Sequence, residues 1–146
     1  KLRIEFTKSR PRHSNDNALV ESKNGAVVRK HLGYTHIPQR FAKKVNVFCT
    51  AFLNPYVNFH RPCFFPEMIT DTKDKERKKY RYEHMMTPFE KLKSLPDATL
   101  YLKPGMTFEQ LDAVASRMSD NDAAAALNQA RQALFQSIAD ALKQSA

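Results

Sequence analysis

The chain has 146 residues, a length that fits one domain or a compact domain with an appended helical segment. Its 24 Lys and Arg residues exceed its 15 Asp and Glu residues, which gives a formal net charge of +9. No apolar run of about 18 or more residues and no signal pattern at the N-terminus occur, so we expect neither a membrane span nor a secretory leader. We therefore expect a cytoplasmic protein whose two cysteines, Cys49 and Cys63, are buried free thiols.

The positive charge is concentrated in the first two-thirds of the chain. Up to Pro96 there are twenty Lys and Arg against nine Asp and Glu, whereas the last fifty residues hold four against six. Lys and Arg that neutralise phosphates release condensed counterions, which favours nucleic-acid binding. The alternative is a basic surface that only faces solvent.

The first elements expected along the chain are a strand and a helix. Leu2, Ile4 and Phe6 alternate with charged residues, a period of two that predicts a strand over 1–6 with one buried face. This strand needs a partner from upstream residues, another copy of the chain or the hairpin described below. A helix is expected from Asn17 to His31, ending at Gly33.

A second helix is expected from Pro38 to about Leu53. Its apolar residues Phe41, Val45, Phe48 and Phe52 recur at helical spacing and predict one buried face, which we interpret as core rather than as a binding surface. The dipeptide Asn54-Pro55 is expected to stop this helix, because the residue before a proline disfavours helical geometry.

A basic hairpin is expected next. The runs FFPEMIT (64–70) and RKKYRY (77–82) have strand character, and the polar segment DTKDKE (71–76) separates them. Interleaved Lys, Arg and Tyr residues suit contact with phosphates and bases. The alternative is a solvated hairpin whose lysines protect an exposed edge. A short helix is then expected, capped by Thr87 and ended by Pro96.

The last part of the chain predicts a helical hairpin after a boundary near 103–105. Thr107 and Gln110 form a capping box for a helix to about Met118. A longer helix is expected over 122–143, and its apolar stripe consists of Leu127, Leu134, Ile138 and Leu142. This stripe must be buried either by self-association or by docking onto the preceding domain.

Three segments resemble parts of a known enzyme family. They are FTKSRPRHSNDNALVESKNGAVVR (6–29), NPYVNF (54–59) and YRYEHMMTPFEKL (80–92). Their order and spacing over residues 4–95 resemble the C-terminal part of insertion-sequence transposases with a retroviral-integrase-type, ribonuclease H-like catalytic core. In this resemblance Glu21 corresponds to the glutamate of the catalytic Asp-Asp-Glu set.

The resemblance implies a metal-dependent phosphoryl transfer. Enzymes of this type hold a pair of Mg²⁺ ions with three carboxylates, and the ions activate the nucleophile and stabilise the leaving oxygen. Glu21 would be the third ligand, whereas the two aspartates lie upstream in such enzymes. Asp16 is the sole aspartate before Glu21 and is too close along the chain to replace either. We therefore expect weak Mg²⁺ binding and no strand cleavage by this chain alone, the upstream half having been lost by cloning, proteolysis or gene decay.

Residues near the glutamate and in the hairpin are expected to contact transposon-end and target DNA, with plain solvent exposure as the alternative for each. The residues expected to contact DNA are Lys8, Arg10, Arg12, Asn17, Lys23, Asn24, Lys75, Lys78, Lys79 and Arg81. The five histidines show no HxxxH or HxH pair, so we expect no zinc site.

These observations predict an α+β, mainly helical chain with three parts. Residues 1–60 are expected to form the strand and Glu-bearing helix of a truncated ribonuclease H-like core. Residues 61–103 are expected to form a basic hairpin and a short helix, and residues 104–146 a helical hairpin. The first hypothesis is a transposase fragment that binds DNA and forms a homo-oligomer, with no membrane or small-molecule partner. The second is a non-enzymatic DNA-binding or assembly module that oligomerises through its N-terminal strand and C-terminal helices. A third is a basic RNA-binding protein, for which a single-strand preference dependent on Tyr80 and Tyr82 would be evidence.

Overall fold

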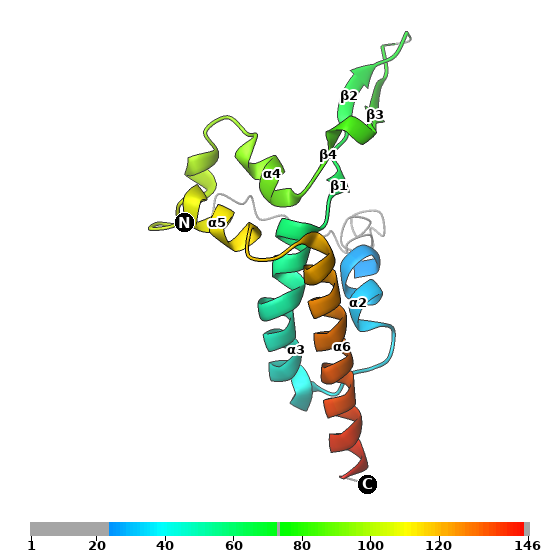
Figure 1. Cartoon of the computed structure of the whole chain (residues 1–146). Helices are drawn as coiled ribbons and strands as arrows, with labels where there is room; N and C mark the ends of the chain where they lie inside the picture. The colour runs from blue at the N-terminus through cyan, green and yellow to red at the C-terminus, as the bar shows by residue number, and fades with distance from the viewer. Residues whose placement is uncertain (1–23, 73, 145–146) are drawn as a thin grey trace. The chain divides into compact units, whose positions relative to one another are not determined.

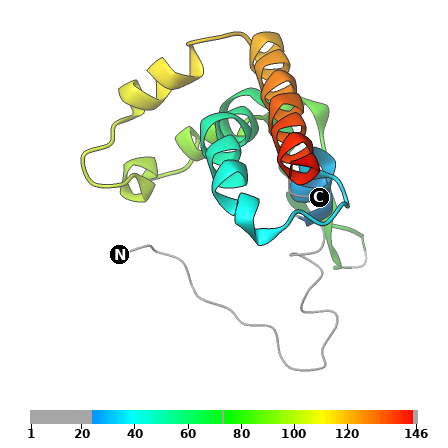
Figure 2. The same cartoon turned by 90° about the horizontal axis from the view of Figure 1, so that it is seen from below.

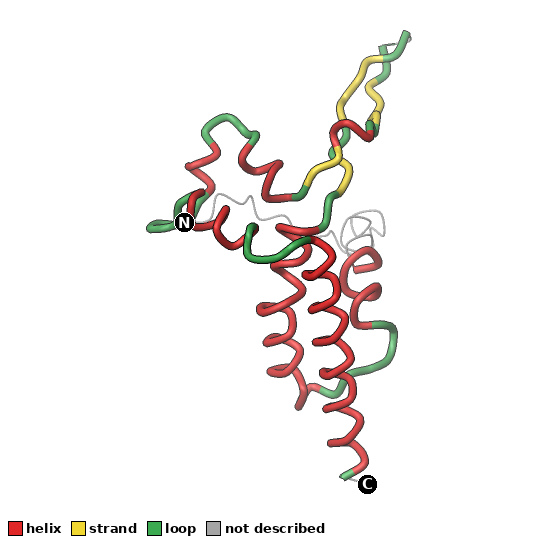
Figure 3. Tube along the Cα trace, viewed as in Figure 1, coloured by secondary structure: helices red, strands yellow, loops and turns green. Residues whose placement is uncertain are grey.

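The computed structural model describes residues 24–72 and 74–144. The chain forms two compact units, residues 1–43 and 44–146. The described residues are mainly helical and include two small antiparallel sheets of two strands each, as Figure 3 shows. The expected α+β, mainly helical class is thus confirmed, whereas the ribonuclease H-like core stays a prediction.

The described part of the first unit begins with a helical segment that ends at Gly33. The π-helical segment η2 (Asn24–Arg29) continues into α2 (Lys30–Leu32), and the amide of Gly33 donates to the carbonyl of Arg29 at 2.9 Å. Gly33 has a φ of 75°, which a residue without a Cβ adopts readily. The predicted helix end at Gly33 is therefore confirmed, and its predicted start at Asn17 lies outside the described residues.

A long helix follows and does not end where the sequence predicts. After the 3₁₀ turn η3 (Gln39–Phe41), α3 (Ala42–Phe48) continues into η4 (Cys49–Leu53) and η5 (Tyr56–His60), with Asn54 and Pro55 in helical geometry between them. The prediction that Asn54-Pro55 stops the helix is wrong. The ring of a proline crowds the carbonyl four residues back, and the wider π-helical turns on both sides of Pro55 leave room for it.

The π-helical turn also changes which residues are buried. Phe48 and Leu53 are buried, with exposed fractions of 3% and 4%, whereas Phe52 is 39% exposed. The predicted face is correct for Phe41 and Phe48, and Val45 is half-buried. It is wrong for Phe52, because the extra residue in the wider turn moves the buried face one position along the chain.

The strands form two separate ladders. The predicted hairpin is confirmed as β2 (Glu67–Thr70) and β3 (Glu76–Lys79), which pair antiparallel with Met68 opposite Lys78, and both strands are shorter than predicted. A second ladder, β1 (Cys63–Phe64) with β4 (Met85–Met86), was not predicted. Two-residue strands are too short to show an alternating pattern.

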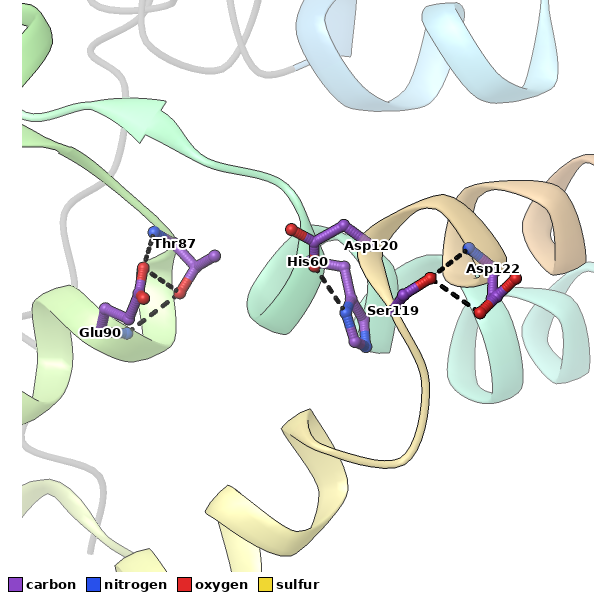
Figure 4. Close-up of polar contacts among 6 residues, drawn as sticks. All are labelled: His60, Thr87, Glu90, Ser119, Asp120 and Asp122. Atoms are coloured by element: carbon purple, nitrogen blue, oxygen red, sulfur yellow. Dashed lines mark hydrogen bonds and ion pairs between the residues drawn. The ribbon is translucent and has the colours of Figure 1, made fainter.

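The remaining helices begin at residues that the sequence identifies. Thr87 caps α4 (Pro88–Lys93) through a reciprocal capping box with Glu90, and Thr107 caps α5 (Phe108–Ala115) in the same way. Figure 4 shows the first of these boxes. Short 3₁₀ segments, η6 (Tyr82–His84) and η7 (Ala98–Tyr101), precede and follow α4. Both capping predictions are confirmed, although α5 ends before Met118.

The last helix, α6 (Asp120–Lys143), packs on η4 and η5, alongside which it lies in Figures 1 and 2. Its side chains Ala123, Leu127, Leu134 and Ile138 are buried, whereas Leu142 is 40% exposed. The stripe predicted for this helix is thus correct except at Leu142. Of the two ways to bury this stripe, the structure shows docking onto an earlier part of the chain, the helical segments η4 and η5. No helix in the described ranges is long and apolar enough to cross a membrane.

Candidate nucleic-acid interface

The β2–β3 hairpin carries the densest group of basic residues in the described part of the chain. Residues 67–84 contain six Lys or Arg and also five Asp or Glu, so their formal charge is only slightly positive. All residues of β3 are exposed, as are three of the four in β2. Most side chains of both strands thus face solvent, and those on each face decide what the ribbon can bind.

One face of the hairpin is held by ion pairs. Arg81, two residues after Lys79, lies on the side of Glu67, and its Nε is 3.2 Å from Glu67 Oε2. Its Nη1 is 3.1 Å from Glu83 Oε1. Nδ1 of His84 is 3.0 Å from the other oxygen of Glu67. The carboxylate of Glu67 thus contacts both Arg81 and His84, which lie before and after Tyr82 in the chain.

The loop of the hairpin contains another ion pair. Nε of Arg77 lies 2.9 Å from Oδ2 of Asp71, and the Asp71 side chain also accepts from the amide of Lys75 at 3.1 Å. Asp74 takes the left-handed conformation, with a φ of 53°, and its amide donates to the carbonyl of Asp71. These contacts fix the turn and neutralise Arg77, so Arg77 and Arg81 both have carboxylate partners within the hairpin.

Three lysines of the hairpin are not neutralised in this way. Among residues 24–72 and 74–144, no carboxylate lies within ion-pair distance of Lys75, Lys78 or Lys79. All three are exposed. These three cations of the hairpin can therefore neutralise a phosphate without first breaking an ion pair to a described residue.

The opposite face of the hairpin carries aromatic side chains. The rings of Tyr80 and Tyr82 both meet Phe64 edge-on, with ring centroids 6.3 Å and 5.2 Å apart. Strand alternation places Lys78 on this same face, across from Met68. Phe64 was predicted as part of a strand but not as part of a site, because its contacts with Tyr80 and Tyr82 depend on strand register rather than on nearness in the sequence.

The structure brings only some of the predicted site residues together. Lys75, Lys78, Lys79 and Arg81 lie on the hairpin, and Asn24 is exposed at the start of η2. The predicted residues that lie outside the described residues are Lys8, Arg10, Arg12, Asn17, Glu21 and Lys23. The acidic partners Glu67 and Asp71 were missed, although the near balance of acids and bases in 67–84 was a visible signal.

The described residues contain no group of three or more His, Cys, Asp or Glu side chains that could hold a metal ion. Glu21, the predicted Mg²⁺ ligand, lies outside the described residues. Cys49 and Cys63 are free thiols, as predicted, but they are half-buried and not buried, and burial raises the pKa of the Cys49 thiol.

No protein-family model, curated protein or solved structure matches the chain.

Proposed function

We propose that this chain is the C-terminal part of an insertion-sequence transposase with an integrase-type core, in which it binds DNA and supplies Glu21 as the third metal-ligand carboxylate. The two aspartate ligands of the Mg²⁺ ions would come from outside these residues. Support for the family comes from the three ordered motifs in 6–29, 54–59 and 80–92.

The observation that best supports DNA binding is the set of three exposed lysines, Lys75, Lys78 and Lys79, that have no carboxylate partner among the residues the structure describes. A double helix presents a regular array of phosphates, and each lysine that meets a phosphate adds a salt-dependent increment to affinity. Arg77 and Arg81 would contribute less, because binding a phosphate requires them to exchange an existing carboxylate partner.

The alternative function is a non-enzymatic DNA-binding or assembly module. It shares the basic hairpin but requires oligomerisation through the N-terminal strand and the C-terminal helices. The apolar stripe of α6 is already buried within the same unit, which favours the transposase proposal over assembly through that helix.

The test is binding of the chain to a labelled DNA duplex across a salt series, with and without Mg²⁺. The variant Lys75→Ala/Lys78→Ala/Lys79→Ala removes the three unpaired cations. We expect weaker binding. The slope of log affinity against log salt concentration is expected to decrease in magnitude by up to about 2.7, because each lost phosphate contact removes about 0.9 from it. Arg81→Ala alone is expected to change the slope less than Lys79→Ala alone.

The matched control is Lys43→Ala/Lys103→Ala/Lys143→Ala, which removes the same charge from three exposed lysines outside the hairpin. An equal change of slope in both variants would show that only net charge matters and would count against the hairpin as the contact. Absence of duplex binding at low salt would refute the DNA-binding role.

A further inference from the structure

The aromatic face of the hairpin has a geometry that phosphate binding does not require. Tyr82 is 83% exposed, Tyr80 58% and Phe64 40%. Exposed rings that touch one another form a contiguous apolar surface, and such surfaces on a small ribbon mark a contact with another molecule.

The Tyr82 ring is held in place although it is exposed. Arg81, directly before Tyr82, and His84, two residues after it, both contact the carboxylate of Glu67, at 3.2 Å and 3.0 Å, and these contacts restrict the backbone around Tyr82. The ring itself meets Phe64 at 79° between planes, while Phe64 belongs to the β1–β4 ladder. A ring ordered before binding loses little conformational freedom when a ligand stacks on it.

Charge indicates which ligand suits this surface. Lys78 lies on the same face as Tyr80 and has no ion-pair partner among the described residues. An aromatic surface beside a free cation matches a chain of stacked bases joined by phosphates. Duplex DNA hides the faces of its bases, whereas an unpaired strand exposes them.

We propose that Phe64, Tyr80 and Tyr82 form a stacking platform for the unpaired bases of a DNA strand, with Lys78 beside it on the phosphate backbone. This inference rests on the proposed function and refines it, because it assigns the lysines to the backbone and the rings to bases that have left the duplex. The most exposed ring, Tyr82, receives a base, and Phe64 positions it.

The chain contains no tryptophan, so Tyr82→Trp introduces a single reporter at the platform. Titration with an oligothymidylate is expected to quench the emission of this tryptophan. Tighter binding of an oligouridylate of the same length would instead favour the RNA-binding hypothesis and overturn the DNA platform. The matched control is Tyr101→Trp in η7, a tyrosine that is 56% exposed and lies outside the aromatic face. Its emission is expected to stay unchanged.

The affinity of Tyr82→Ala for the same oligothymidylate is measured in parallel with its affinity for duplex. We expect a loss of roughly 5- to 150-fold for the single strand and little change for duplex, with the salt dependence of both retained because no charge is removed. Circular dichroism checks that the exposed substitution leaves the fold intact.

Unchanged emission of the tryptophan at position 82, together with unchanged single-strand affinity of Tyr82→Ala, would overturn the platform. If duplex binding then kept its steep salt dependence on the three lysines, the proposed function would stand and the aromatic face would be a contact for a protein. If neither single strand nor duplex bound at low salt, both proposals would fail together.

Discussion

At the scale of single residues, the contact between His60 and Asp120 joins two helices that are far apart in the chain. The imidazole of His60 is buried at the end of η5, with its side chain 6% exposed, and its Nδ1 lies 3.0 Å from Oδ1 of Asp120 (Figure 4). Asp120 is the first residue of α6, where a carboxylate also interacts favourably with the helix dipole. The contact therefore fixes the start of α6 against η5.

We expect Asp120→Ala to lower the free energy of unfolding by about 1–2 kcal/mol, because it leaves a buried imidazole nitrogen without this acceptor. The control is Asp122→Ala, which removes a carboxylate from the same helical turn and loses the exposed contact with Ser119 in place of the contact with His60. Both variants lose the helix-dipole interaction, so their difference compares the buried contact with the exposed one. Urea unfolding followed by circular dichroism measures this difference, and equal losses in the two variants would show that the His60 contact stabilises the fold no more than the exposed one.

Individual capping residues could be predicted from the sequence, whereas ion-pair partners could not. Thr87 with Glu90 and Thr107 with Gln110 act within three residues, so the local pattern contains the whole interaction. Arg81 also pairs with Glu83, two positions away, but its partner Glu67 is fourteen positions away and meets it only through the register of β2 with β3. Its side chain was therefore predicted to contact DNA without any account of its ion pairs.

At the scale of elements, the long helix from α3 to η5 shows how one wider turn changes a buried face. A regular α-helix would place Phe52 in line with Phe48, as the sequence predicts. The π-helical turn η4 instead buries Leu53 and leaves Phe52 partly exposed, stacked on Phe48 with ring centroids 6.4 Å apart. No residue pattern in CTAFL distinguishes the two arrangements, because both place apolar side chains within one turn.

The adjacent substitutions Leu53→Ala and Phe52→Ala test this arrangement. Leu53→Ala is expected to cost about 2–5 kcal/mol of unfolding free energy, as for a buried leucine that leaves a cavity. Phe52→Ala is expected to cost about 1 kcal/mol, because much of its ring already faces solvent. Chemical denaturation of the two variants gives the comparison. The reverse order, with Phe52 the more costly, would mean that the helix keeps regular α geometry through this segment.

At the scale of the whole molecule, the sequence predicted most elements and few of the contacts between them. The hairpin, α4, α5 and α6 begin close to their predicted positions because their turns and caps are local signals. The candidate interface was predicted as a basic hairpin with interleaved tyrosines, and the structure divides it into an ion-paired face and an aromatic face. That division depends on strand register and on the β1–β4 ladder, neither of which a pattern of single residues specifies. The division of the chain into parts at 60 and 103 stays a prediction.

The burial of α6 within its own unit gives a test between the transposase proposal and assembly through the C-terminal helices. Leu134 is 7% exposed and belongs to the stripe on α6, which packs on η4 and η5, whereas Leu142 on the same helix is 40% exposed. We expect Leu134→Ala to lower the free energy of unfolding by about 2–5 kcal/mol and Leu142→Ala to have a much smaller effect. The decrease in Tm caused by Leu134→Ala is expected to be the same at low and at high protein concentration. Thermal unfolding across a wide range of protein concentrations is the measurement.

An interface between copies would instead make Tm rise with concentration, because association stabilises the folded state by mass action. If that rise disappeared in Leu134→Ala, α6 would be the interface and the assembly module would become the better account of this chain.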